Sequence, residues 1–158
     1  VRDQVRFDEM SVERWRKMFD VNVIGSFVCA REAVMRMSTR HGGAGGSIVN
    51  VSSAASYLGS PGEYIDYAAT KAAIDTMTMG LGKEVAEEGI RVNAVRPGVV
   101  YTEIHANGGE PGRVDRVAAG VPMRRGGQPE EVAETILWLA SEAASYITAT
   151  TLNVSGGR

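Results

Sequence analysis

Two strand-like segments separated by one long helical segment constrain this fold more than any other feature. The stretches "SIVNVSS" (47–53) and "IRVNAV" (90–95) are rich in β-branched residues, and the second ends before Pro97. Residues 63–88 between them have a helical pattern, and Gly89 follows as a suitable C-terminal cap. Strands that alternate with helices are typical of an α/β fold with a parallel sheet.

The rest of the chain continues this alternation, and no internal repeat or second domain interrupts it. One α/β domain over residues 1–158 is therefore predicted. The glycine-rich stretch 40–47 is expected to be a turn and not a phosphate cradle, because a strand follows it where a cradle would open a helix. The other expected elements are a helix at 11–36 capped by Ser11, a loop with short helical pieces at 99–127, a helix at 128–141 with Pro129 near its start, and a strand at 150–155.

Composition excludes several functional classes. The formal net charge is −2 and 44% of residues are hydrophobic, so neither nucleic acid nor an anionic membrane is expected as a partner. No apolar run reaches membrane-spanning length. Cys29 is the single cysteine, and we expect a buried thiol in a cytoplasmic protein. His41 and His105 lack metal-ligand spacing, so no metal site is predicted.

Two glycines inside the second helix carry a structural prediction. Gly80 and Gly82 each cost about 1 kcal/mol relative to alanine in a helix interior. Small residues that are retained at such a cost suggest that another backbone approaches the helix closely.

Candidate catalytic groups are expected to meet at one edge of the sheet. Tyr67 and Lys71 are four residues apart, so on a helix they share a face. Ser53 closes the first strand and Pro97-Gly98 follow the second, and sites in such sheets form beyond the carboxyl ends of strands. The tyrosine–lysine spacing is either a packing accident or a way of making a phenol usable near neutral pH. Taken singly, these residues have ordinary structural interpretations.

As an ordered set, six segments of the chain resemble the C-terminal two-thirds of a short-chain dehydrogenase/reductase. The resemblance runs from about residue 10 to the end and implies a Rossmann-like doubly wound parallel sheet, here lacking its N-terminal strands and helices. The segments are "DVNVIGSF" (20–27), "GSIVNVSSAAS" (46–56), "YAATK" (67–71), "GIRVNAVRPGVVYT" (89–102), "GQPEEVAETILWLAS" (127–141) and the C-terminal "SYIT…LNVSGG".

The resemblance implies an NAD(P)-dependent oxidoreductase that interconverts an alcohol and a ketone or aldehyde by hydride transfer. Tyr67 would be the general acid/base, and Lys71 would lower the pKa of Tyr67 by its charge. Ser53 would orient the substrate oxygen. Asn22, which lies beside an apolar helix stripe, would hold a water that links Lys71 to solvent.

The same resemblance implies where NAD or NADP would bind. Tyr67 and Lys71 would contact the nicotinamide ribose side, and Pro97, Gly98, Val100 and Thr102 form the segment that would meet the nicotinamide. Residues 103–125 would form a variable substrate lid. Nothing in them identifies the substrate. The choice between NAD and NADP depends on a charge near the adenine ribose, in the part of the family pattern that this sequence does not contain.

Two departures qualify this resemblance. The interval from Ser53 to Tyr67 is one residue longer than is common, although Ser52 would lengthen it further. The family's glycine-rich turn for the pyrophosphate does not occur in the chain, which begins at Val1 and reads as the continuation of something longer. These 158 residues alone are therefore not expected to sustain turnover.

An alternative interpretation is a non-catalytic remnant that serves as an association module. The helices at 11–36 and 63–88 resemble the pair that forms the family's dimer interface. A homodimer or homotetramer is accordingly expected, whichever interpretation holds.

Overall fold

The computed structural model describes residues 4–158; residues 1–3 of the predicted domain lie outside the described part. Helices and parallel strands alternate along the chain as predicted. The helical elements are η1 (Phe7–Glu9), α1 (Val12–Phe19), the π-helical η2 (Asp20–Ile24), α2 (Gly25–Met37), η3 (Thr39–His41), α3 (Ala55–Leu58), α4 (Ile65–Glu84), η4 (Ala86–Glu88), α5 (Ile104–Asn107), α6 (Arg113–Ala118), α7 (Pro129–Ala140) and η5 (Glu142–Ala144). The strands are β1 (Gly46–Val51), β2 (Ile90–Pro97) and β3 (Thr151–Val154).

The sheet has the order β1-β2-β3, and both neighbouring pairs are parallel. Its register runs from Gly46 opposite Ile90 to Val51 opposite Val95 on one side of β2. This confirms the predicted α/β fold. The middle strand extends through Pro97, although we expected it to end before that residue.

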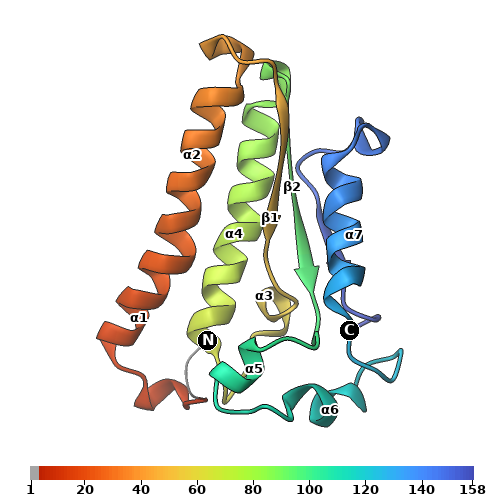
Figure 1. The fold of residues 1–158 in the computed structure, drawn as a ribbon. Helices are drawn as coiled ribbons and strands as arrows, with labels where there is room; N and C mark the ends of the chain where they lie inside the picture. Colours follow the sequence, from red (N-terminus) through yellow and green to blue (C-terminus); the bar gives the residue numbers. More distant parts are fainter. Residues whose placement is uncertain (1–3) are drawn as a thin grey trace.

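Helices cover both faces of the sheet (Figure 1). The continuous helix α1–η2–α2 and the helix α4 lie on one side, and α7 lies on the other. A buried apolar cluster lies between the sheet and the helices on the α4 side. It comprises Val85, Ile90 and Val92, with Val34, Met37, Ile48 and Leu81 packed against them. The short helices α5 and α6 lie beyond the end of β2, where the strands point (Figure 1).

The first long helix begins where the sequence predicts. The Ser11 hydroxyl accepts a hydrogen bond from the Arg14 N–H at 3.2 Å and so satisfies one of the unpaired donors of the first turn. The helix widens into a π-turn around Asn22 before it continues to Met37. Such π-turns within helices are frequent at functional sites.

Cys29 is exposed, so the prediction of a buried thiol was wrong. Its apolar helical surroundings suggested a core position. In residues 4–158, however, much of that apolar surface remains uncovered: Phe27 is 48% and Val28 44% exposed. A helical pattern identifies an apolar face but does not say whether this chain itself covers it.

The two glycines of α4 differ. A Cβ added to Gly82 would lie 2.8 Å from the Ala149 nitrogen and 2.9 Å from the Val92 carbonyl oxygen, so the predicted close approach of another backbone is confirmed there. Around Gly80 nothing lies within 4 Å of such a Cβ, so the same prediction was wrong for Gly80. Gly82 lets α4 lie directly against the sheet.

The segment between β2 and α7 is a loop with the short helices α5 and α6, as predicted. At its end, the Glu131 carboxylate accepts a hydrogen bond from the Gln128 N–H at 2.8 Å and so caps α7. Among the helices formed by residues 4–158, none combines the length and apolar character that crossing a bilayer requires.

Candidate active site

Two adjacent serines, Ser52 and Ser53, follow β1 and make different contacts. Ser52 is buried, and its hydroxyl donates a hydrogen bond to the backbone carbonyl of Lys71 at 3.1 Å. Ser53 is half-buried, and its hydroxyl accepts from the Ala55 N–H at 3.1 Å. The first serine therefore attaches the strand end to α4, whereas the second lies where a ligand can reach it.

Tyr67 and Lys71 lie in the first two turns of α4 and approach each other. The Lys71 Nζ lies 5.6 Å from the centroid of the Tyr67 ring and donates a hydrogen bond to the Val51 carbonyl at 2.8 Å. The helix thus places the ammonium and the aromatic ring on one side, as their spacing predicted.

A cavity of about 780 Å³ opens at this edge of the sheet. It lies at the carboxyl ends of the strands, the usual place for ligands in such sheets. All but one of the candidate site residues line it: Ser53, Tyr67, Lys71, Pro97, Gly98, Val100 and Thr102.

Gly98 is required by its surroundings at the cavity. A Cβ there would lie 2.8 Å from the Ser155 Cα, so a side chain would push the end of β2 away from the segment after β3. Glycine therefore lets the end of β2, which lines the cavity, pack closely against the segment after β3.

The electrostatic environment of Tyr67 differs from the expectation. Burial raises the pKa of the Tyr67 phenol, and a hydrogen bond with the Ser53 side chain opposes that change. The pKa of Lys71 is lowered, because burial disfavours the charged ammonium more than the nearby Asp75 carboxylate favours it. The expected lowering of the Tyr67 pKa is not found, because loss of water around the phenol outweighs the hydrogen bond with Ser53.

Asn22 does not line the cavity. Its side-chain amide donates to the Thr70 hydroxyl at 3.1 Å and to the Met18 sulfur at 3.2 Å, while its backbone carbonyl accepts from the Ser26 hydroxyl at 2.7 Å. The amide thus forms its hydrogen bond to α4 across the interface between η2 and α4, away from the cavity. Its part in a proton relay stays a prediction.

Two residues of the segment expected to form a substrate lid, His105 and Arg113, also line the cavity. His105, expected in a loop, lies in α5, where its Nε2 is 3.0 Å from the Val100 carbonyl oxygen. Arg113 of α6 donates to the Glu63 carboxylate at 2.5 Å and lies over the Tyr64 ring. The Arg113–Glu63 contact joins residues 50 positions apart, so no local pattern predicts it. The His105–Val100 contact spans only five positions.

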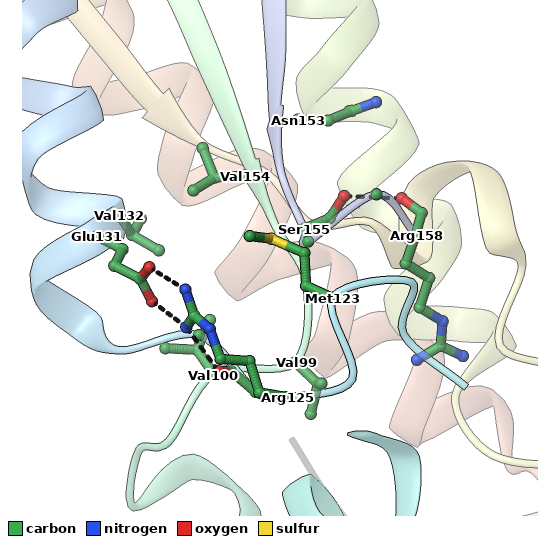
Figure 2. A pocket seen from close by; sticks show the side chains of 14 residues that line it. Val99, Val100, Met123, Arg125, Glu131, Val132, Asn153, Val154, Ser155 and Arg158 are labelled. Atoms are coloured by element: carbon green, nitrogen blue, oxygen red, sulfur yellow. Dashed lines mark hydrogen bonds and ion pairs between the residues drawn. The ribbon is translucent and has the colours of Figure 1, made fainter. Parts of the chain in front are cut away.

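A smaller pocket of about 400 Å³ adjoins the cavity on the α7 side (Figure 2). Val99, Val100, Val132 and Arg158 line both. Arg125 and Glu131 form a two-point ion pair at its edge, with distances of 2.6 and 2.7 Å. In this pair the Arg125 and Glu131 charges neutralise each other.

Within residues 4–158, no group of three or more histidine, cysteine, aspartate or glutamate side chains is arranged to hold a metal ion. The glycine-rich stretch leads into β1, as predicted, so no helix N-terminus follows it. Around the cavity, Ser53, Tyr67 and Lys71 supply a hydroxyl, a phenol and an ammonium group. The Glu63 carboxylate, the His105 imidazole and the Arg113 guanidinium line the same cavity.

Comparisons with known proteins agree with this picture. The family described as "Enoyl-(Acyl carrier protein) reductase" matches residues 1–158. The uncharacterized oxidoreductase YgfF of Escherichia coli is 59% identical over 155 residues, which cover 98% of this chain and 63% of that protein. A 3-oxoacyl-[acyl-carrier-protein] reductase of Synechocystis is 40% identical over 150 residues, covering 94% of this chain and 57% of that protein.

Among solved structures, an acetoin dehydrogenase (YohF) of Salmonella typhimurium superposes with a TM-score of 0.84 at 33% identity. The superposition covers 99% of this chain and 60% of that one. The chain therefore spans roughly three-fifths of the length of the proteins that it matches.

Proposed function

The chain belongs to the short-chain dehydrogenase/reductase family, and we propose that it supplies the catalytic part of an NAD(P)-dependent oxidoreductase interconverting an alcohol and a ketone or aldehyde. One observation carries the proposal: a phenol, an ammonium and a hydroxyl, from Tyr67, Lys71 and Ser53, line one cavity. Reduction of a carbonyl builds negative charge on its oxygen, and donors aimed at that oxygen stabilise the transition state.

Tyr67 is the proton donor in this proposal. Its raised pKa keeps the phenol protonated at neutral pH, so that it can donate a proton to the carbonyl oxygen during reduction. In the opposite direction, the phenolate takes the proton of the alcohol. Ser53 holds the same oxygen through its hydroxyl, which also interacts with Tyr67.

Lys71 stabilises the phenolate that remains after proton donation. One of its three N–H donors is used by the Val51 carbonyl, which fixes the side chain and leaves two donors for a ribose or a water. In this scheme Asn22 acts indirectly: it donates to the Thr70 hydroxyl, which donates to the Tyr67 carbonyl, and it does not contact the cavity.

The residues present fit the nicotinamide end of the cofactor. Gly98 adds no side chain to the cavity wall, the exposed Thr102 offers a hydroxyl, and Pro97 and Val100 provide apolar surface. NAD or NADP would supply or accept the hydride. The pyrophosphate needs a glycine-rich turn before a helix, which this sequence does not contain, so we propose that the 158 residues alone do not sustain turnover.

The test uses the complete product of the reading frame that contains residues 1–158. A panel of alcohols and ketones, beginning with sugars and 3-oxoacyl thioesters, is assayed with NADH and NADPH, and the isolated chain is assayed beside it. Tyr67→Phe is expected to lower kcat at least about a hundredfold, since proton transfer contributes typically 10²–10⁴-fold.

The paired serines provide a matched control. Ser53→Ala should lower kcat, whereas Ser52→Ala should mainly lower Tm, because it removes a buried bond to the Lys71 carbonyl. Equal kcat for wild type, Tyr67→Phe and Ser53→Ala would contradict the proposed chemistry.

Self-association is a second candidate function, and one observation favours it. Large apolar side chains are exposed on the long helix α1–η2–α2 and on the neighbouring α4: Phe19, Val21, Ile24, Phe27, Val28, Met35 and, on α4, Met79. Contiguous exposed apolar surface marks an interaction site. We propose that a second copy covers this surface in a homodimer or homotetramer, and sedimentation equilibrium would test this.

We also propose that the protein is cytoplasmic, because its one cysteine, Cys29, is a free and exposed thiol, which a reducing compartment preserves.

A further inference from the structure

The most buried ion pair in residues 4–158 lies directly beside Tyr67. It joins Arg14 of α1 to Asp66 of α4, whose side chains are only 9% and 1% exposed. Arg14 Nε donates to Asp66 Oδ2 at 2.6 Å, and Arg14 Nη2 donates to Oδ1 at 3.2 Å. Two parallel hydrogen bonds fix the angle between the partners as well as their separation.

The same carboxylate holds the backbone of Tyr67. Asp66 Oδ1 accepts a hydrogen bond from the Tyr67 N–H at 2.9 Å. That N–H belongs to the first turn of α4, where backbone donors have no partner within the helix. A negative charge there is also favoured by the helix dipole.

The other side of Tyr67 is held from the same long helix. The buried Thr70 hydroxyl donates to the Tyr67 carbonyl at 2.7 Å, and the Asn22 amide donates to the Thr70 oxygen at 3.1 Å. Arg14 and Asn22 both belong to the helix α1–η2–α2, so the two peptide groups that flank Tyr67 are both tied to it.

We propose that Arg14 and Asp66 are positioning residues, which hold the first turn of α4 so that the Tyr67 hydroxyl stays on the cavity wall beside Ser53 and Lys71. This inference rests on the proposed function of Tyr67. The hydroxyl lies at the far end of the ring, so a small tilt of the turn displaces it substantially. A displacement of about 1 Å can cost about a hundredfold in rate.

The variants separate positioning from stability. Asp66→Asn keeps an acceptor oxygen for the Tyr67 N–H but removes the charge, and Arg14→Lys keeps the charge but removes the planar fork. Ser38→Ala is the matched control. It deletes a part-buried hydrogen bond between elements, from Ser38 to Glu88 at 2.5 Å, together with the bond that the Ser38 hydroxyl accepts from the Arg40 N–H; Glu88 lies just beyond the opposite end of α4.

The complete gene product is assayed at a temperature where every variant is folded by circular dichroism. We expect Asp66→Asn and Arg14→Lys to lower kcat about tenfold to a hundredfold and to change KM less than about threefold. Ser38→Ala should lower Tm while kcat stays at the wild-type value. Unchanged kcat in both site variants, or an equal loss in Ser38→Ala, would overturn the proposal.

A second readout does not depend on activity. The Tyr67 ring is followed by ¹³C NMR in tyrosine-labelled protein, and its signal is assigned by its disappearance in Tyr67→Phe. Asp66→Asn and Arg14→Lys should shift or broaden this signal, and Ser38→Ala should not. An inactive wild type with the expected NMR changes would refute the proposed function and support the positioning role. An unshifted Tyr67 signal in both site variants would refute the positioning role itself.

Discussion

The sharpest test of the fold compares one substitution at two positions of α4. Gly80 and Gly82 lie in the same helix, and replacing either by alanine improves helix propensity by about 1 kcal/mol. At Gly80 the new methyl meets nothing within 4 Å, so this gain should be realised. For a protein of this size, 1 kcal/mol corresponds to about 2–4 °C in Tm. Gly80→Ala should therefore raise Tm by about 2–4 °C.

At Gly82 the same methyl meets backbone. It would lie 2.8 Å from the Ala149 nitrogen and 2.9 Å from the Val92 oxygen, two atoms that are hydrogen-bonded to each other at 2.8 Å. Backbone cannot rotate away as a side chain can, and overpacking costs about 1–3 kcal/mol. At the upper end of that range the net loss is about 2 kcal/mol, or about 4–8 °C in Tm.

Thermal unfolding followed by circular dichroism, with urea unfolding as a second measure, would check both values. The propensity term is common to the two variants, so their difference reports the contact between α4 and the sheet alone. A Gly82→Ala protein as stable as Gly80→Ala would show that the helix does not lie against Val92 and Ala149 as described.

Three further predictions follow from charge and exposure. The hydrogen bond from Arg116 lowers the pKa of Glu110 to about 2. The ionised Glu110 therefore contributes its full stabilisation above its ordinary pKa of 4.5, and this stabilisation is lost as the pH falls toward 2. Tm should fall over that interval, and it should fall less steeply in Glu110→Gln. Burial raises the pKa of Tyr67, so alcohol oxidation should accelerate toward alkaline pH, and Lys71→Met should move that rise to still higher pH; a flat pH profile would contradict this. Ile24, 57% exposed, lies on the proposed association surface, so Ile24→Glu should yield monomers in sedimentation, whereas Leu137→Glu on α7, also at an exposed position, should not.

Much of the local structure could be predicted because its cause lies within a few residues. Ser11 caps its helix through a residue three positions later, and Pro129 begins α7 where its missing N–H costs nothing. The tyrosine–lysine pair shares a helix face by spacing alone. Strand positions were predicted to within about two residues, which is the usual uncertainty of element ends.

The predictions that failed depend on what distant segments do. Cys29 is exposed because residues 4–158 leave its helix face uncovered, and Gly80 differs from Gly82 only in which side of α4 faces the sheet. The Tyr67 pKa rises because surrounding segments remove water from the phenol, a sum over neighbours that spacing does not reveal.

The sequence by itself thus determined the order of helices and strands, the shared face of Tyr67 and Lys71, and the edge of the sheet where Ser53 meets them. Tertiary structure alone decided which residues of the expected lid segment line the cavity, namely His105 and Arg113, and that Arg14 reaches Asp66 across 52 residues. The side-chain periodicity of a helix or strand depends on residues that are close in the sequence, whereas burial and ion pairing depend on how distant segments pack together.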